Sequence, residues 1–218
     1  MHISPVPPAK NEALEQLLRY CHRRRYPSKT VIVKPGDSGE TLHYITEGSV
    51  AVSMHSEIAG HDIVLAYLNK GDFIGEVGVF MGPMTRDVTV VTREPSQLAE
   101  IGYNRLHQLL KGELSEHAFG ILQALGRQLS TRLLSTSRKA GTLAFLDVTG
   151  RISHTLTELC RQPDAMTHPD GMQIRITRQE IGRIVGCSRE VAGKVLKNLE
   201  KQGLLSVKGK TIVVLGAR

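Results

Sequence analysis

One face of a predicted helix near the C-terminus holds the side chains in this 218-residue sequence that are best suited to recognise another molecule. The face presents five charged residues and one glycine: Arg189, Glu190, Gly193, Lys194, Lys197 and Lys201. The opposite face has apolar residues at i, i+3, i+4 and i+7, a spacing that predicts burial: Ala192, Val195, Leu196 and Leu199. Guanidinium, ammonium and carboxylate groups on one exposed face can hydrogen-bond to base edges in the major groove of DNA.

A helix-turn-helix over Ile176–Leu205 is the element that would position this face. The sequence predicts a first helix, a tight turn at Gly186-Cys187 and a second helix that Ser188 opens. The serine hydroxyl is a favoured N-cap because it accepts from free N–H groups of the first turn. In such a motif the second helix enters the major groove. An ordinary surface helical hairpin is the alternative interpretation.

Basic residues are concentrated around this pair of helices. From Met172 to Arg218 there are ten Lys/Arg against three Asp/Glu, whereas the rest of the chain has 18 of each. Two predicted strands after the second helix, Leu204–Val207 and Thr211–Leu215, flank the basic tip at 208–210, which is typical of a wing. Because phosphate contacts supply much of the affinity for DNA, a basic module on a neutral body fits a DNA-binding unit.

The remaining composition excludes several classes of protein. The chain has no run of 18 apolar residues, and its N-terminal segment lacks the apolar core of a signal peptide. We therefore expect a cytoplasmic protein with no membrane contact. Its three cysteines, Cys21, Cys160 and Cys187, are an odd number without CxxC spacing. They predict buried or half-buried thiols and no metal site.

Short strands and glycine-rich turns fill the region from about residue 28 to 104. A short helix over about 10–22 precedes them. Strand-like runs occur at Leu42–Met54, Ile63–Leu68, Val88–Val91 and Leu98–Tyr103. Regular short strands separated by Gly, Pro and Asp predict an antiparallel sandwich or barrel.

The apolar period changes from about residue 114 to 140. Residues then recur in alternating steps of four and three, the pattern of a coiled-coil seam: Ala118, Leu122, Leu125 and Leu129. The same steps next reach the polar residues Arg132 and Thr136. Either a group other than a helix meets the seam there, or the helix rolls and Leu133 takes over the contact. Asp147 is a natural N-cap for the next helix, which places a boundary near 143–147.

The order of these elements resembles the CRP/FNR superfamily of bacterial transcription factors, in particular its cyclic AMP receptor protein branch. The motifs are GDFIGEVGVF at 71–80, LAFLDVTGR at 143–151, RQPDAMTHPDG at 161–171, ITRQEIGRIVGCSRE at 176–190 and the GKTIVV ending. The resemblance implies an α+β fold with four parts: a cyclic-nucleotide-binding β-roll (a double-stranded β-helix or jelly roll) over 1–113, a dimerisation helix over 114–142, a hinge at 143–147 and a winged helix-turn-helix over 148–218. The four-cysteine cluster of the FNR branch is missing.

The resemblance also implies a ligand site at a phosphate-binding cassette that contains Gly75, Glu76 and Arg86. The glycine lets the backbone approach a phosphate. Glu76 can accept from a ribose 2′-hydroxyl, and the planar guanidinium of Arg86 suits a cyclic phosphate. Arg132 matches a helix residue that braces this site in the family. Thr136 and Ser137 match the two residues that contact adenine, one from each subunit.

One cassette position departs from the family pattern. Asp87 stands where the family usually has Ser or Thr, and a carboxylate repels a cyclic phosphate instead of donating to it. At about 4 Å and an effective dielectric near 20, the repulsion costs roughly 4 kcal/mol as an upper bound. An acid here resembles the Clp (CAP-like) branch, whose members respond to cyclic di-GMP, and it can accept from guanine N1–H and N2–H. Cyclic AMP and cyclic di-GMP are both retained as ligands, with ligand-free DNA binding as a third option.

The same resemblance assigns residues to DNA and to RNA polymerase. The implied base contacts are Arg189, Glu190 and Lys194, of which Lys194 replaces the usual Arg and lacks its bidentate fork. The candidates for phosphate contacts are Thr177, Arg178, Gln179, Ser188 and Lys208. Two surfaces match polymerase-activating regions of the family: Ala165, Thr167, His168 and Gly171 in one, and His22, Arg24 and Arg105 in the other.

The sequence therefore predicts a homodimeric transcription regulator, mainly an activator and secondarily a repressor, that binds palindromic double-stranded DNA under cyclic-nucleotide control. Whether the ligand activates or inhibits is left open. A ligand-independent DNA-binding regulator is one alternative. A cyclic-nucleotide phosphodiesterase is the alternative from another class. It would need metal ligands or an activated nucleophile in the cassette, and the sequence shows neither, so no catalytic residue is assigned.

Overall fold

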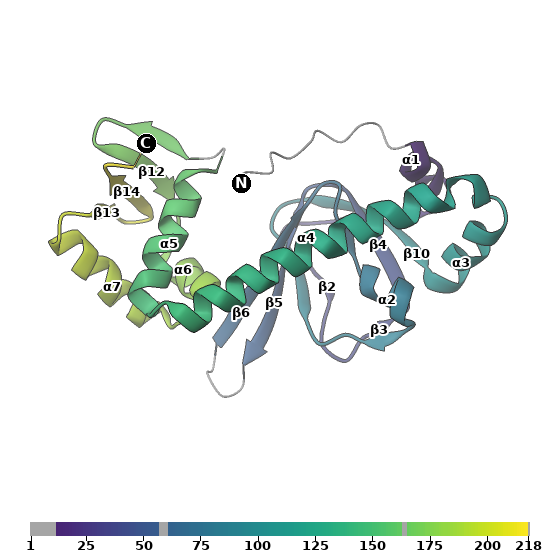
Figure 1. Ribbon diagram of the computed structural model, residues 1–218, viewed down its shortest axis with the longest axis horizontal. Coiled ribbons are helices and arrows are strands. Elements are labelled where there is room, and N and C mark those ends of the chain that lie inside the picture. The colour runs from purple at the N-terminus through teal and green to yellow at the C-terminus, as the bar shows by residue number, and fades with distance from the viewer. Residues whose placement is uncertain (1–11, 57–60, 163–164, 218) are drawn as a thin grey trace. The chain divides into compact units, whose positions relative to one another are not determined.

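The computed structural model of the protein describes residues 12–56, 61–162 and 165–217 (Figure 1). The chain forms two compact units, each with its own core. The first comprises Met1–Val52 and Ala66–Ser135, and the second comprises Ser53–Leu65 and Thr136–Arg218. The expectations for the N-terminal segment up to residue 11, and for residues 163–164 of the motif at 161–171, lie outside the described residues.

Strands dominate the N-terminal half of the chain. In chain order its elements are α1 (Glu12–Leu18), β1 (His22–Tyr26), β2 (Val31–Val33), β3 (Ser38–Gly39), β4 (Thr41–Glu47), β5 (Ser49–Ser56), β6 (His61–Asn69), β7 (Phe73–Ile74), α2 (Glu76–Met81), β8 (Met84–Thr85), β9 (Thr89–Thr92), β10 (Ser96–Gly102), α3 (Tyr103–Lys111) and the 3-10 turn η1 (Ser115–His117). Two four-stranded sheets have the orders β1-β10-β4-β7 and β2-β9-β5-β6, beside the small sheet β3-β8. The pairs β1·β10, β10·β4, β4·β7 and β2·β9 are antiparallel, so the predicted antiparallel sandwich is confirmed.

The core of the first unit lies between the two sheets. Ile45 and Leu98 come from one sheet and Val50 from the other, and each side chain is fully buried. Alternate residues of a strand point to opposite faces, so each sheet supplies one apolar layer. A second apolar cluster joins α1, α3 and α4 to the sheet β1-β10-β4-β7 and includes Leu106 and Ile121.

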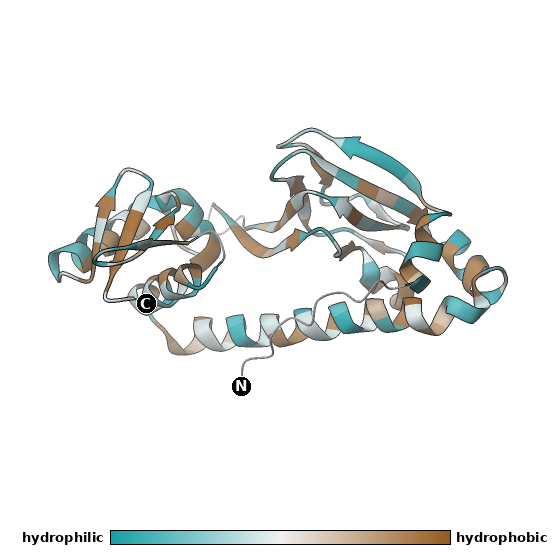
Figure 2. Ribbon diagram, turned by 90° about the horizontal axis from the view of Figure 1, so that it is seen from above, coloured by the Kyte–Doolittle hydropathy of each residue, from teal (hydrophilic) through white to brown (hydrophobic). Residues whose placement is uncertain are grey.

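Helix α4 (Ala118–Phe145) has 28 residues and carries both hydrophilic and hydrophobic turns (Figure 2). The predicted seam on this helix is partly wrong. Leu125 is completely buried in the core of its own unit, together with Ile121. The face of the helix that packs against the β-roll of the same chain includes Leu125. The large apolar side chains that α4 leaves exposed up to residue 135 are Phe119, Leu122, Leu133 and Leu134.

The second unit contains a three-helix, four-stranded module. Its elements are α5 (Val148–Cys160), β11 (Met166–His168), β12 (Gly171–Arg175), α6 (Arg178–Val185), α7 (Arg189–Lys201), β13 (Leu205–Lys208) and β14 (Thr211–Leu215). The sheet order is β11-β12-β14-β13, with antiparallel pairs. The hairpin of β13 and β14 confirms the predicted strands of the wing. The core joins all three helices to the sheet through Ile152, Ile181, Leu196 and Ile212.

The predicted helix caps and turn are confirmed in this module. Asp147 accepts from the N–H of Gly150 at 2.7 Å, and Ser188 accepts from the N–H of Val191 at 3.3 Å. Gly186 ends α6 in the left-handed region, with φ of 71° and ψ of 51°. A glycine has no Cβ penalty there, which favours it at a helix C-terminus. The two helices are therefore joined as the sequence predicts.

Part of the motif at 161–171 lies in the sheet of this unit. Residues 166–168 form β11, which pairs with β12 in the register His168 opposite Gly171. Gly171 is buried, and a Cβ there would lie 2.0 Å from the carbonyl oxygen of Val214. The close approach of β14 therefore requires a glycine at position 171.

The predicted thiols are confirmed: all three cysteines are free, Cys21 half-buried and the other two buried. Burial raises the pKa of Cys21 to about 11. Within the described ranges, no cluster of three His, Cys, Asp or Glu side chains is arranged to hold a metal ion. No helix among the same residues is long and apolar enough to cross a membrane.

Candidate functional site

The cassette begins where β7 ends and α2 starts. Gly75 joins the two elements with φ of 86°, in the left-handed region that favours glycine. A Cβ at this position would lie 2.6 Å from Nη2 of Arg86 and 2.7 Å from the carbonyl oxygen of Thr41. Both the backbone conformation and the packed guanidinium therefore require a glycine.

Arg86 follows β8 and reaches the cassette from a separate segment of the chain. Its Nη2 donates to the carbonyl oxygen of Thr41 at 2.8 Å and to the hydroxyl of Tyr103 at 3.1 Å. The hydroxyl of Tyr103 donates in turn to the carbonyl oxygen of Gly75 at 2.6 Å. The structure places Gly75 and Arg86 side by side, as the cassette of the resemblance requires. The resemblance does not identify Tyr103, which joins them.

Glu76 is the first residue of α2, and only 1% of its surface is exposed. Its Oε1 accepts from Nη1 of Arg132 at 2.5 Å, and Nη2 of Arg132 donates to the carbonyl oxygen of Phe73 at 2.7 Å. Arg132 thus braces the cassette, as the resemblance implies. Burial raises the pKa of Glu76, and the adjacent Arg132 guanidinium opposes this shift.

A polar atom of Glu76 has no hydrogen-bond partner. Among the residues that the structure describes, nothing donates to its Oε2, although this atom is buried. Burying an unpaired carboxylate oxygen costs free energy, so such an atom points to a donor from another molecule.

Gln128 on α4 is a second residue that the sequence does not single out. Its side-chain oxygen accepts from the N–H of Phe73 at 2.7 Å, and its side-chain nitrogen donates to the Phe73 carbonyl at 2.8 Å. The amide therefore continues the short strand β7 as a neighbouring strand would. A glutamine on a mostly exposed helix gives no signal in the sequence that it pairs with a strand 55 residues away.

Asp87 is exposed, and among the described side chains no ion pair joins it to Arg86. Arg86 uses Nη2 for Thr41 and Tyr103 instead. Thr136 and Ser137 are exposed on α4 in the second unit, four and five residues after Arg132. The structure thus brings four of the seven expected ligand residues together: Gly75, Glu76, Arg86 and Arg132.

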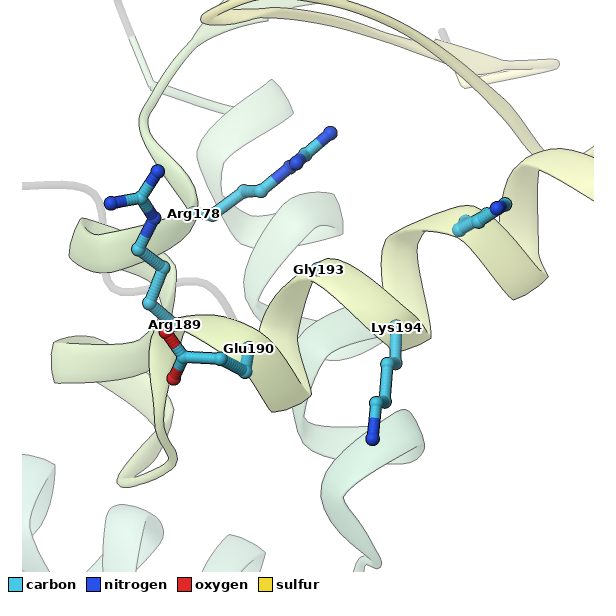
Figure 3. A pocket seen from close by; sticks show the side chains of 6 residues that line it. Arg178, Arg189, Glu190, Gly193 and Lys194 are labelled. Atoms are coloured by element: carbon cyan, nitrogen blue, oxygen red, sulfur yellow. The ribbon is translucent and has the colours of Figure 1, made fainter.

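The expected base-contacting residues lie on one exposed face of α7. An open hollow of about 380 Å³ is lined by Arg178, Arg189, Glu190, Gly193, Lys194 and Lys197. Figure 3 shows Arg189 and Glu190 on the first turn of the helix, and Lys194 one turn later. Hydrogen bonds from its own backbone N–H and from Ser188 lower the pKa of Glu190. The carboxylate is thereby kept as an acceptor, which is the form that can bind a cytosine amino group.

The candidate phosphate contacts surround this face. Thr177 and Ser188 cap α6 and α7 by accepting from the N–H groups of Glu180 and Val191. A hydroxyl that accepts in a cap keeps its hydrogen, so Thr177 can still donate to a phosphate, whereas Ser188 uses its hydrogen for the carboxylate of Glu190. The exposed side chains of this set are Arg178, Gln179 and Lys208, the last at the tip of the wing.

The two candidate polymerase surfaces differ in character. Thr167 is exposed, Ala165 and His168 are half-buried, and Gly171 is buried under β14. A hollow of about 730 Å³ lies beside them, lined by residues 167–172 and 216–217. On the other surface His22, Arg24 and Arg105 are all exposed. Arg24 lies over the ring of Tyr26 at 5.2 Å, and Arg105 pairs with Glu113 at 3.5 Å.

Comparison with known proteins agrees with this geometry in both units. Residues 23–113 match the family model of the cyclic nucleotide-binding domain, and residues 150–217 match that of the Crp-like helix-turn-helix domain. The chain is 52% identical over 212 residues to the cAMP-activated global transcriptional regulator Vfr of Pseudomonas aeruginosa, with 96% of each chain covered. It is 51% identical over 205 residues to the CRP-like protein Clp of Xanthomonas euvesicatoria pv. vesicatoria, covering 94% of this chain and 89% of that protein.

A solved structure shows the same fold. The c-di-GMP responsive global regulator CLP of Xanthomonas campestris matches with a TM-score of 0.88 at 50% identity, over 94% of this chain and 99% of that one. Identity of this extent over nearly the full length, together with both domain matches, establishes the family. The chain belongs to the CRP/FNR family of transcription regulators, with a cyclic nucleotide-binding domain followed by a Crp-like helix-turn-helix domain.

Proposed function

We propose that this chain is a homodimeric transcription regulator whose binding to palindromic DNA is controlled by a cyclic nucleotide in the cassette. The observation that carries the proposal is the buried Oε2 of Glu76, which has no donor among the described residues. A ribose 2′-hydroxyl would supply the missing hydrogen bond. A neutral hydroxyl suits this place because it adds no charge to a buried ion pair.

The cyclic phosphate would bind at Arg86. Both described hydrogen bonds of this side chain come from Nη2, so the N–H groups of Nη1 and Nε can point to a ligand. Gly75 leaves the backbone uncovered next to the guanidinium. A planar cationic fork beside bare backbone matches a singly charged phosphate.

Two nucleotides fit this proposal for different reasons. The relative Vfr is described as cAMP-activated, and the structural neighbour CLP as c-di-GMP responsive. Asp87 is exposed and free to accept from guanine, which favours cyclic di-GMP. The same carboxylate weakens cyclic AMP through repulsion of its phosphate. The seven ligand residues of the proposal are Gly75, Glu76, Arg86, Asp87, Arg132, Thr136 and Ser137.

A dimer would form along α4. Phe119 is 77% exposed and Leu133 is 68% exposed, on a helix that needs a partner to bury them. Thr136 and Ser137 follow on the same helix and would contact the base of a nucleotide, one from each subunit. The proposal assigns residues 1–113 to nucleotide binding, 114–142 to the dimer helix, 143–147 to a hinge and 148–218 to DNA binding.

The DNA interface of the proposal is the exposed face of α7. Arg189 would bind guanine and Glu190 cytosine, while Lys194 would contact a base as a point charge without a bidentate fork. Two copies related by a two-fold axis would bind half-sites about one helical turn apart. RNA polymerase would contact the surface around Thr167 and His168 and the surface of His22, Arg24 and Arg105.

Calorimetric titration of the purified protein with cyclic AMP and with cyclic di-GMP tests the ligand. We expect one of the two to bind with micromolar affinity or better, and Glu76→Gln to weaken it. If the wild-type protein binds neither nucleotide, the proposed control is wrong. Hydrolysis of either nucleotide in the same samples would instead support the phosphodiesterase alternative.

A further inference from the structure

The hydroxyl of Tyr103 connects the two cassette groups that lie closest to the proposed phosphate. Tyr103 is the first residue of α3, directly after β10, and is only 3% exposed. Its ring lies against α2, because a Cβ at Gly78 would be 2.5 Å from the hydroxyl oxygen and 2.6 Å from Cε2. The glycine at position 78 therefore makes room for this ring.

The direction of each hydrogen bond at this hydroxyl is determined by the chemistry of its partners. A carbonyl oxygen only accepts, so the hydroxyl donates to Gly75 at 2.6 Å. A guanidinium only donates, so the hydroxyl accepts from Nη2 of Arg86 at 3.1 Å. One hydroxyl thus uses its donor and an acceptor lone pair at the same time. A phenylalanine ring could fill the space but could make neither bond.

These two bonds restrain both partners. The Gly75 carbonyl also accepts from the N–H of Gly78 at 3.1 Å, so the peptide group after Gly75 is fixed at two points. Without Tyr103, the Arg86 guanidinium would keep only one of its hydrogen bonds to the described residues, the bond to the Thr41 carbonyl. A long side chain held at one acceptor retains more rotamer freedom, and binding must then freeze it.

We propose that Tyr103 is a positioning residue for phosphate recognition: its hydroxyl holds Arg86 and the Gly75 peptide in the arrangement that binds the cyclic phosphate. The inference rests on the proposed function, because it requires a nucleotide at this cassette. It goes further by assigning the orientation of the phosphate-binding groups to a residue that does not touch the ligand. The structural alternative is that Tyr103 only fills the core between α2 and α3.

A double-mutant cycle separates these roles. Dissociation constants for cyclic AMP and cyclic di-GMP are measured by NMR titration, which reaches millimolar values, on four proteins: wild type, Tyr103→Phe, Arg86→Gln and the double variant. Tyr26→Phe is the matched control, since its hydroxyl also donates to a side chain of the same unit, Glu100, at 2.5 Å. Thermal unfolding of each variant reports on the fold.

We expect Tyr103→Phe to weaken binding about tenfold in the wild-type background, the size expected for losing a hydrogen bond to a charged group. In the Arg86→Gln background we expect a clearly smaller loss, because only the Gly75 peptide is left to be positioned. Tyr26→Phe should bind as tightly as the wild type. Equal losses in the two backgrounds would mean that Tyr103 only packs, and would overturn the inference. So would a Tyr103→Phe protein with unchanged affinity.

A second measurement needs no Tyr103 variant. The guanidinium signals of Arg86 in the ¹⁵N-labelled wild type are assigned by their loss in Arg86→Gln. Separate Nη signals before ligand is added would show a restrained side chain, as inferred, whereas averaged signals would contradict it. If the wild type binds neither nucleotide, the proposed function fails and the positioning role fails with it. If the wild type binds but the cycle shows no coupling, only the role of Tyr103 is wrong.

Discussion

At the scale of single residues, we propose that Asp87 sets the preference of the cassette between cyclic AMP and cyclic di-GMP. We expect Asp87→Ser to strengthen cyclic AMP binding about tenfold, because a repelling charge is replaced by a donor. The gain should be well below the upper bound of roughly 4 kcal/mol, since Asp87 is exposed and water screens its charge. Calorimetric titration of cyclic AMP and cyclic di-GMP into both proteins measures the change.

The matched variant for this substitution is Asp87→Asn, which keeps the shape and removes the charge. It should recover most of the gain for cyclic AMP if repulsion is the cause. The repulsion argument is wrong if the wild type already binds cyclic AMP tightly and neither substitution changes the affinity.

The residues that the sequence identifies and those that it misses differ in how they act. Glu76 and Arg86 lie within ten residues of each other in a stretch that resembles the family, so their types and order identify them. Tyr103 and Gln128 act through contacts with backbone atoms of distant segments, Gly75 and Phe73. No local spacing predicts such a pair, because the fold alone brings the segments together.

At the scale of elements, the sheet β10-β4-β7 holds a buried histidine next to the cassette. His43 on β4 lies opposite Glu100 of β10 and Ile74 of β7 in the sheet. Its Nδ1 is buried and has no partner among the described residues. Burial lowers the pKa of His43 below its ordinary value of 6.5, and Arg86 adds to this while Glu100 opposes it.

Stability should therefore decrease in mildly acidic solution. Below about pH 6.5 the unfolded chain takes up a proton at this histidine while the folded chain does not, so the free energy of unfolding falls as the pH falls. Above that pH the histidine is neutral in both states, and the free energy of unfolding no longer depends on its protonation. Urea denaturation at a series of pH values from 7.5 to about 5 should show a weaker decline for His43→Gln than for the wild type. His154→Gln, at an exposed histidine, should retain the wild-type decline, and equal declines in all three proteins would refute the role of His43.

Helix α4 shows how far periodicity can predict contacts. The heptad-like steps correctly indicate a long helix with an apolar face. They place Leu125 in the intermolecular seam, but Leu125 packs into its own unit beside Ile121. The reason is that one face of α4 packs into the core of its own unit while another leaves apolar side chains exposed. A single period in the sequence cannot separate these two faces. Leu133 is exposed, which fits the alternative that the helix rolls and that Leu133 makes the contact with a second subunit.

The exposed stripe makes a testable prediction about assembly. Leu133→Glu places a charge in the proposed subunit contact, so we expect the dimer to dissociate at micromolar concentration in sedimentation equilibrium. Thr131→Glu is the control, because it adds the same charge two residues earlier on another side of the helix. The proposed contact is wrong if Leu133→Glu stays dimeric, or if both variants dissociate equally.

At the scale of the whole molecule, the charge distribution and the two units describe a sensor joined to a DNA-binding module. The excess positive charge lies in the last fifth of the chain, which contains α6, α7 and the wing. Helix α4 is continuous from the residues near Arg132, which contacts Glu76, to Phe145. A nucleotide can change DNA binding only through a difference in its affinity for the two arrangements of the molecule.

The most direct test of nucleotide control is DNA affinity measured with and without each ligand. Fluorescence anisotropy at constant salt, on a palindromic site selected from random sequence by the protein, gives this affinity without the changes that ionic strength alone would cause. We expect saturating cyclic AMP or cyclic di-GMP to change the dissociation constant at least tenfold in the wild type, and to change it far less in Glu76→Gln. An affinity that is the same with no nucleotide, with cyclic AMP and with cyclic di-GMP would contradict nucleotide control and identify a ligand-independent regulator.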